Sequence, residues 1–186
     1  MYPLWQTIAP PQLIARALQL EALSEILNSV RSGHGRCVVV TGEAGIGKSR
    51  LVHELSAGAA GFSLLQGTCS EDSDGVAYGP LQDLLRRHLS GLPPDKQLDA
   101  LGPWAGELTR LLPELAWTLT GGGSDATLAP NLERQRLFEA LMQFLMRLAA
   151  IRPALIIVED IHWSDEASLE FLHLLARRLA TLPICL

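Results

Sequence analysis

The sequence predicts an α/β fold in which a parallel β-sheet carries helices on both faces. Two β-branched, apolar segments, 37–41 and 154–158, and a third candidate strand, 62–67, are separated by helical patterns. The segments 37–41 and 154–158 are apolar without alternation, which is typical of strands buried on both faces of a parallel sheet. Strands that alternate with helices indicate this architecture, and 186 residues suffice for a single domain spanning 1–186.

The helices are predicted from apolar residues that recur every three or four positions. This periodicity covers 13–30, 48–57, pieces of 78–120 broken by Pro93-Pro94, Pro103 and Pro113, and then 132–151 and 165–180. The segment 183–186 is predicted as the start of another strand, and 68–75 and 120–126 as surface loops. Residues 1–35 then form a helical lead-in to a core at 36–186.

Composition and charge exclude several classes of protein. The net charge is −5 and the pI about 5.5, whereas a nucleic-acid reader normally has a basic face. The apolar runs are much shorter than the roughly 18 residues needed to cross a membrane, and no export signal precedes them. The cysteines, Cys37, Cys69 and Cys185, form no CxxC pair and are predicted to be small core residues. A cytoplasmic protein is expected.

A glycine-rich turn follows the first predicted strand. It reads Gly42-x-x-x-x-Gly47-Lys48-Ser49, a phosphate-binding pattern, whose alternative is a turn without a ligand. Glycines give the positive φ angles and close backbone approach that a polyphosphate needs, and the next helix adds its positive N-terminal end. Lys48 is predicted to bind the β and γ phosphates and Ser49 to bind Mg²⁺. The predicted binding residues are Gly42, Glu43, Ala44, Gly45, Ile46, Gly47, Lys48, Ser49 and Arg50.

Paired acids end the apolar segment 154–158. Glu159 and Asp160 stand where a nucleotide site needs one carboxylate near the magnesium shell and another to orient or deprotonate a water. We predict that both are catalytic and that Glu159 and Ser49 contribute to the metal site. The alternative is that the two acids only cap the strand or the next helix.

The residues after the acid pair have less specific interpretations. His162 is either a sensor of the γ-phosphate or a histidine packed in a loop, and Trp163 is predicted to anchor packing. Ser164 or Asp165 is predicted to cap the following helix. Arg177 and Arg178 are expected on a solvated face.

Taken together, these motifs resemble a known family. The segments "VVVTGEAGIGKSRLVHEL", "GTCSEDSDGVAYGPLQDLL", "ERQRLFEALMQFLMRLA" and "LIIVEDIHWSDEASLEFLHLLARRL" make the chain similar to the P-loop ATPase domain of the STAND class, signal-transduction ATPases with numerous domains. The likeness is to the AAA-like module of large ATP-binding LuxR-type transcriptional regulators and of proteins near adenylate cyclases. It implies a three-layer P-loop NTPase fold, ATP and Mg²⁺ as cofactors, and an output domain elsewhere.

The chain departs from that family at three places. AAA-type enzymes often have Asp followed by Glu as the base, whereas here Glu159 precedes Asp160, which implies slow hydrolysis suited to a switch. Ala15-Arg16 stands where the family shows a Gly-Arg pair, so the adenine-side role of Arg16 stays open. The sequence ends at Leu186, inside the predicted strand that the family follows with a sensor and a lid, so we expect a fold that is incomplete at its C-terminus.

Three functions are compatible with these residues. The leading hypothesis is an ATP-binding regulatory module that exchanges ATP for ADP and hydrolyses slowly, with nucleotide-dependent self-association. An alternative is a nucleotide-binding or interaction module without turnover. A small-molecule P-loop kinase is less well supported, because no acceptor site with lid arginines is recognisable. The adenine preference rests on the resemblance.

Overall fold

The computed structural model describes residues 16–71, 77–115 and 129–186. In chain order, its elements are α1 (Ala17–Arg31), α2 (Lys48–Gly58), β1 (Ser63–Thr68), α3 (Gly79–Ser90), α4 (Pro94–Leu101), η2 (Gly102–Trp104), α5 (Ala105–Leu108), η3 (Thr109–Leu111), α7 (Pro130–Ile151), β2 (Ala154–Glu159), η4 (Ile161–Trp163), α8 (Glu166–Arg178), η5 (Leu179–Thr181) and β3 (Ile184–Cys185). The helices and the later strands fall where the periodicity predicts them. The predicted loop 120–126 lies outside the described residues.

The sheet is parallel throughout and has the order β1-β2-β3. β1 pairs with β2 along its whole length, from Ser63 opposite Ala154 to Thr68 opposite Glu159. β2 is the central strand, and Ala154 to Ile157 are all buried, as its uninterrupted apolar run predicts. β3 pairs with the start of β2 through Ile184 and Cys185.

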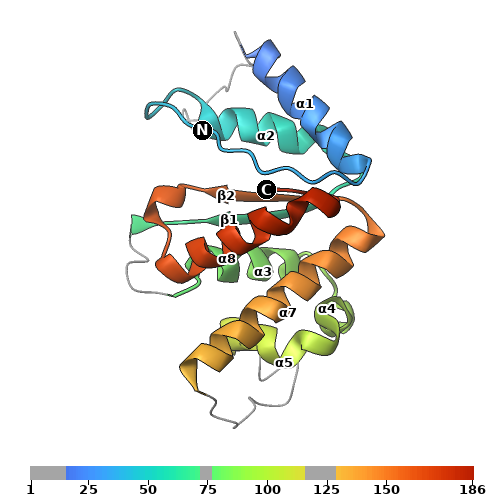
Figure 1. Ribbon diagram of the computed structural model, residues 1–186, viewed down its shortest axis with the longest axis vertical. Helices are drawn as coiled ribbons and strands as arrows, with labels where there is room; N and C mark the ends of the chain where they lie inside the picture. Colours follow the sequence, from blue (N-terminus) through green and yellow to red (C-terminus); the bar gives the residue numbers. More distant parts are fainter. Residues whose placement is uncertain (1–15, 72–76, 116–128) are drawn as a thin grey trace, which may run out of the picture.

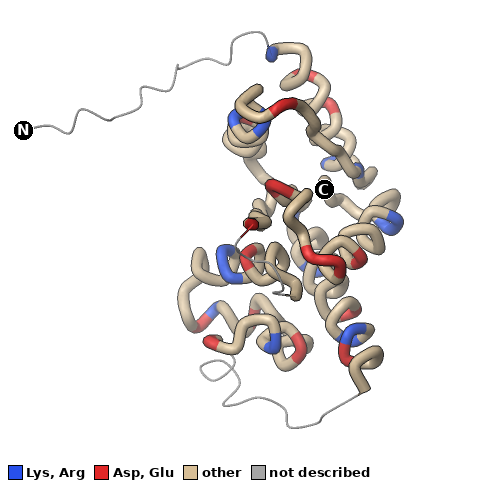
Figure 2. The backbone as a smooth tube through the Cα atoms, turned by 90° about the vertical axis from the view of Figure 1, so that its left-hand side faces the viewer, with Lys and Arg blue, Asp and Glu red and all other residues tan. Residues whose placement is uncertain are grey.

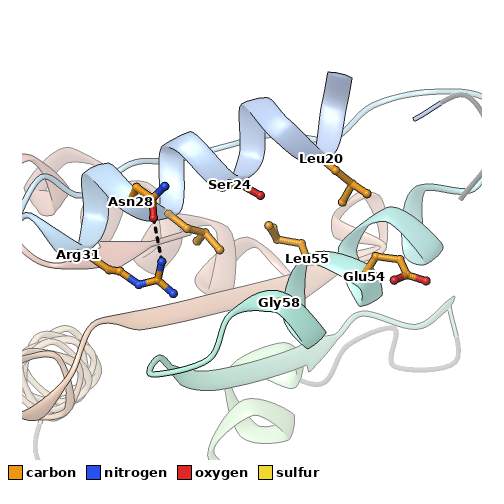
Figure 3. A pocket seen from close by; sticks show the side chains of 8 residues that line it. Leu20, Ser24, Asn28, Arg31, Glu54, Leu55 and Gly58 are labelled. Atoms are coloured by element: carbon orange, nitrogen blue, oxygen red, sulfur yellow. Dashed lines mark hydrogen bonds between the residues drawn. The ribbon is translucent and has the colours of Figure 1, made fainter. Parts of the chain in front are cut away.

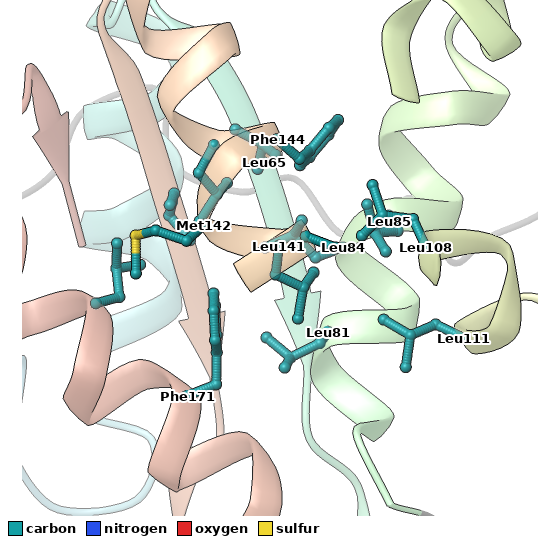
Figure 4. Close-up of a cluster of buried hydrophobic side chains, with 14 of the residues drawn as sticks. Leu65, Leu81, Leu84, Leu85, Leu108, Leu111, Leu141, Met142, Phe144 and Phe171 are labelled. Carbon is teal, nitrogen blue, oxygen red and sulfur yellow. The ribbon is translucent and has the colours of Figure 1, made fainter. Parts of the chain in front are cut away.

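Helices cover both faces of this sheet and produce two apolar clusters (Figure 1). On one face, α1 and α2 pack against Leu155, Ile157 and Cys185. The opposite face carries α3, α7 and α8 with the shorter helices beyond them, and its cluster is the larger (Figure 4). Phe144 and Phe171 are among its fully buried side chains. The predicted three-layer α/β fold is therefore present.

The surface of the helical layers mixes charges of both signs. Figure 2 shows basic and acidic residues interspersed along the described elements. Some form ion pairs between helices, such as Arg134 with Glu170 at 3.0 Å between α7 and α8. Arg177 and Arg178 are exposed, as predicted. Within 16–71, 77–115 and 129–186, no helix combines the length and apolar character that crossing a membrane requires.

The two helices on the smaller face leave a shallow groove between them. Its volume is about 230 Å³. Apolar and polar side chains of both α1 and α2 line it (Figure 3). The lining residues are Leu20, Ser24, Leu27, Asn28, Arg31, Glu54, Leu55 and Gly58.

The prediction of a fully buried strand at 37–41 is wrong. Only Arg36 forms a bridge, to Cys185, and the Val38 N–H donates to the carbonyl of Leu186 at 2.7 Å. Residues 39–41 form no strand among the described residues, and the Val39 side chain is 74% exposed. Cys37 is also exposed, which corrects its prediction as a core residue, whereas Cys69 and Cys185 are buried as predicted.

Candidate functional site

The glycine turn joins the extended segment 36–41, from here on called its lead-in, to the first turn of α2. Gly45 and Gly47 have φ angles of +75° and +94°, a region in which other residues are strained. A Cβ at either position would meet nothing within 4 Å, so the backbone angle, and not crowding, requires glycine. Gly47 is the N-cap of α2, and the unpaired N–H groups of this 11-residue helix therefore begin at the turn. Open space beside free N–H groups suits an anion.

Two basic side chains contact the carbonyl groups of the turn. The Lys48 ammonium donates to the carbonyl oxygens of Gly42 and Glu43, each at 3.0 Å. Arg16, just before α1, donates through Nη2 to the carbonyl of Ile46 at 2.8 Å. Among the described residues Lys48 forms no salt bridge. Its contacts are with neutral oxygens, and a phosphate would be a stronger acceptor.

The remaining predicted residues of the turn lie in sequence around this loop. Glu43, Ala44 and Ile46 are exposed, and Ser49 is exposed in the first turn of α2. Arg50 forms a salt bridge with Glu54 one turn further along α2, with Nη2 and Oε1 3.2 Å apart. The guanidinium of Arg50 therefore already has a carboxylate partner.

The predicted acid pair ends β2. Glu159 is half-buried and lies opposite Thr68, while Asp160 is exposed. Asp160 has φ +55° and ψ +40°, a left-handed conformation that aspartate tolerates better than most residues. This conformation ends the strand and directs the chain into η4. The carbonyl of Glu159 accepts the N–H of Cys69 at 3.0 Å, which keeps the ends of β1 and β2 together.

The strand register places the turn and the acids on the same edge of the sheet. Arg36, Cys185 and Leu155 lie at one level, because Cys185 pairs with both of the others. Adjacent strands are about 4.8 Å apart, so the lead-in lies about 10 Å from β2. From that level, Val40 and Glu159 are equally far along parallel segments. The glycine turn and the acid pair thus leave the sheet on the same side (Figure 1).

The segment after the acids is largely exposed. Trp163 is 45% exposed, so its prediction as a packing anchor is wrong. The turn at Asp160 puts all three residues of η4 on the surface. The rings of His162 and Trp163 lie 5.1 Å apart, and His162 is exposed as well.

Asp165 caps α8, as predicted, and also reaches another helix. Its carboxylate accepts from the N–H of Ser168 at 2.9 Å and from its hydroxyl at 2.6 Å. The same carboxylate accepts the N–H groups of Tyr78 and Gly79, at 2.9 and 3.2 Å, where α3 begins. Burial alone would raise the pKa of Asp165, but the hydrogen bonds from Ser168, Tyr78 and Gly79 outweigh it, so the pKa lies below its ordinary value.

Sequence reasoning missed this link between the start of α8 and the start of α3. The cap at Asp165 has a local signal, whereas its partners at Tyr78 and Gly79 are far away in the sequence. Cys69, which is predicted to be buried, also has an unpredicted partner in this region, the side chain of Ser164. Burial raises the pKa of the Cys69 thiol, Ser164 lowers it by hydrogen bonding, and the charges of Asp165 and Asp160 raise it. Cys69 is therefore a protonated, structural thiol.

The site offers oxygen atoms that could contribute to binding Mg²⁺. No group of three or more His, Cys, Asp or Glu side chains that could hold a metal occurs within the described ranges. Mg²⁺ usually takes only one or two protein ligands and completes its shell with phosphate and water oxygens. Ser49 and Glu159 offer oxygens of the required kind.

Comparison with curated proteins finds a relative that is much longer than this chain. An uncharacterized protein, R02095, from Rhizobium meliloti (strain 1021) is 29% identical over 189 residues. The match covers 94% of this chain but only 18% of the relative's length. No solved structure matches significantly.

A family model supplies the classification. The model for the AAA ATPase domain matches residues 12–186, which include the glycine turn, the acid pair and the described sheet. Because this match covers nearly the whole chain, the protein belongs to the AAA ATPase domain family.

Proposed function

We propose that this chain is the ATP-binding module of a larger regulatory protein and that it hydrolyses ATP slowly. One observation carries the proposal: the glycine turn, with Lys48 at the start of α2, lies on the same sheet edge as Glu159 and Asp160. The groups proposed to bind phosphate and metal therefore lie on one edge of the sheet. Membership of the AAA ATPase domain family, whose members generally bind ATP with Mg²⁺, supports the same conclusion.

Each residue of the site has a defined part in binding. The backbone N–H groups of the turn and of the first turn of α2 hold the phosphates. Lys48 exchanges its two carbonyl contacts for the β and γ phosphate oxygens. Ser49 and Glu159 would hold Mg²⁺, which would neutralise part of the phosphate charge.

Asp160 is the proposed residue for orienting or deprotonating the attacking water. Its side chain is exposed beyond the end of β2, on the edge where the turn also emerges. Aspartate is shorter than the glutamate that many AAA-type enzymes place here, so the carboxylate reaches less far and hydrolysis is slow. Slow turnover suits a switch between ATP and ADP states.

The regulatory role follows from the resemblance to STAND-class ATPases. In that class the nucleotide module controls an output domain, such as the DNA-binding part of a LuxR-type regulator or a cyclase. The relative from Rhizobium meliloti matches over only 18% of its length, which is compatible with a module inside a multidomain protein. Nucleotide-dependent self-association and a cytoplasmic location belong to the same proposal.

Thermal unfolding with nucleotides tests the binding site. The chain has two lysines, so Lys48→Ala has a matched control in Lys96→Ala on the exposed surface of α4. At a ligand concentration of about 100 times Kd, Mg-ATP or Mg-ADP should stabilise the protein by about 2.7 kcal/mol. This corresponds to a rise in Tm of about 5–10 °C. AMP should raise Tm only a little, since it lacks the β-phosphate.

The result for Lys48→Ala decides whether the glycine turn is the nucleotide-binding site. We expect this variant to lose the nucleotide-induced rise in Tm, and Lys96→Ala to retain it. The same rise in both variants would show that the glycine turn does not anchor the nucleotide.

Turnover separates the proposal from a binding module without catalysis. Asp160→Asn should abolish phosphate release from Mg-ATP, with the Mg-ADP affinity unchanged, because it removes the base but no phosphate ligand. Asp99→Asn, at an exposed site in α4, is the control. Wild-type protein that binds ATP but releases no phosphate would favour the non-catalytic alternative. Transfer of phosphate to an added small molecule would instead favour a kinase.

A further inference from the structure

A single carboxylate joins the N-termini of two helices beside the candidate acids. Asp165 caps α8 through Ser168 and at the same time accepts the N–H groups of Tyr78 and Gly79 at the start of α3. The N–H groups at the start of a helix lack intrahelical partners, and a negative charge there is favourable. Asp165 therefore satisfies two helix starts that lie on different sides of the acid pair in the sequence.

The start of α3 is a rigid point of attachment. α3 packs closely on β1, because a Cβ at Gly67 would lie 2.3 Å from the carbonyl oxygen of Pro80. Tyr78, just before the helix, has a left-handed φ of +66°, and its ring contacts Phe138 edge-on at 6.3 Å. Phe138 in turn packs on Phe171 of α8 at 5.5 Å. A segment that binds the N–H groups of Tyr78 and Gly79 is therefore fixed, through α3, to the sheet.

The segment between the acids and Asp165 has few other attachments. Residues 161–163 are exposed, so they gain little from apolar burial. Its backbone hydrogen bonds are local: the Trp163 N–H donates to the carbonyl of Asp160, and the Ser164 N–H donates to that of Ile161. The strain at Asp160, which has a positive φ, must also be held by its surroundings. Beside the hydrogen bond between Ser164 and Cys69, the long-range hydrogen bonds of this segment among the described residues are those of Asp165.

We propose that Asp165 is a positioning residue for the acid pair: it fixes the 160–165 segment to the start of α3 and thereby sets the direction of Asp160. The inference rests on the proposed function and deepens it. Asp165 itself contacts neither phosphate nor metal in this scheme. It acts through the segment it anchors, and a small displacement of a catalytic group is known to reduce turnover up to about a hundredfold.

Asp165→Ser isolates the link between the helices. Serine is a good N-cap, so α8 keeps its cap, but its side chain is too short to reach Tyr78 and Gly79 as well. Asp165→Asn, which matches aspartate in shape, serves as a second variant if the serine form does not fold. Glu166→Gln is the matched control, because Glu166 is an exposed acid in the same first turn of α8.

Amide hydrogen exchange and kinetics give the decisive readouts. We expect the amides of Tyr78, Gly79, Trp163 and Ser164 to exchange about tenfold faster in Asp165→Ser, because each donates a hydrogen bond that the variant loses or loosens. The exchange of the β2 amides should be unchanged. In the same variant kcat should fall about tenfold or more with KM within about twofold of wild type. Glu166→Gln should match wild type in both measurements.

Other results would overturn the inference. Unchanged exchange at Tyr78 and Gly79 would show that Asp165 does not hold the segment, and this holds even where turnover is too slow to measure. Faster exchange with unchanged kcat would show that the link has a structural role only. Failure of the proposed function is seen separately, as wild-type protein that binds no Mg-ADP.

Discussion

Alanine at Gly35 should detach the lead-in of the glycine turn from β3. A Cβ at this position would lie 2.3 Å from the carbonyl oxygen of Leu179 and 2.5 Å from that of Leu182. It would lie 2.8 Å from the carbonyl oxygen of Ile184. These are backbone atoms, so no rotation of a side chain can relieve the overlap. The segment that carries Gly35 must move away from β3.

The loss in the free energy of unfolding follows from the hydrogen bonds that this movement breaks. Arg36 N–H donates to Ile184 at 3.1 Å, Leu186 N–H donates to Arg36 at 2.9 Å, and Val38 N–H donates to Leu186 at 2.7 Å. Each hydrogen bond contributes about 1 kcal/mol net, so their loss lowers the free energy of unfolding by about 3 kcal/mol. For a chain of this length, the expected fall in Tm is about 6–12 °C.

Circular dichroism during heating measures this change. Gly58→Ala is the control, because a Cβ there meets nothing within 4 Å and the residue ends α2. Alanine at Gly58 should leave Tm unchanged or raise the stability by about 0.4–1 kcal/mol. The affinity of Gly35→Ala for Mg-ADP should also fall, since the turn loses its anchor. A Tm for Gly35→Ala within about 2 °C of wild type would refute the argument.

Two further predictions concern ionisable groups. Cys37 is exposed, whereas burial raises the pKa of Cys69, and burial followed by the nearby Cys37 raises that of Cys185 to about 11. A thiol reagent at neutral pH should therefore label one cysteine quickly in folded protein, and Cys37→Ser should abolish the fast phase; three equal phases would contradict this. The pKa of Asp165 lies below its ordinary value of 3.8, so its contribution to stability is present above that pH and is lost as pH falls through the lower, folded-state pKa. The difference in Tm between wild type and Asp165→Asn should shrink on acidification below about pH 4, and a constant difference would contradict the linkage.

Local patterns were sufficient to predict most of the fold. β2 was predicted because its apolar run has no alternation and ends in charged residues, and the structure buries Ala154 to Ile157. The glycine turn was predicted from its own spacing, and the helix that must follow it begins at Lys48, as expected. The cap at Asp165 also depends only on neighbouring residues.

The wrong predictions concern what lies next to a segment in space. The composition of 37–41 favours a buried strand, but burial also requires strands on both sides, and pairing here ends at Val38. The exposure of Cys37 has the same cause. For Trp163, the large apolar ring suggested packing, whereas the backbone turn at Asp160 directs it outward. The second pair of hydrogen bonds to Asp165 joins residues far apart in sequence, for which no local pattern exists.

The pairing of Val38 with Leu186 also affects the order of events in folding. The partner residues are separated by about 150 positions, so closing this contact costs much chain entropy and is expected late. During synthesis, the ribosome makes the glycine turn before it makes the residues that anchor the lead-in of that turn. The nucleotide motif therefore gains its support from the sheet only after residues 184–186 have been made.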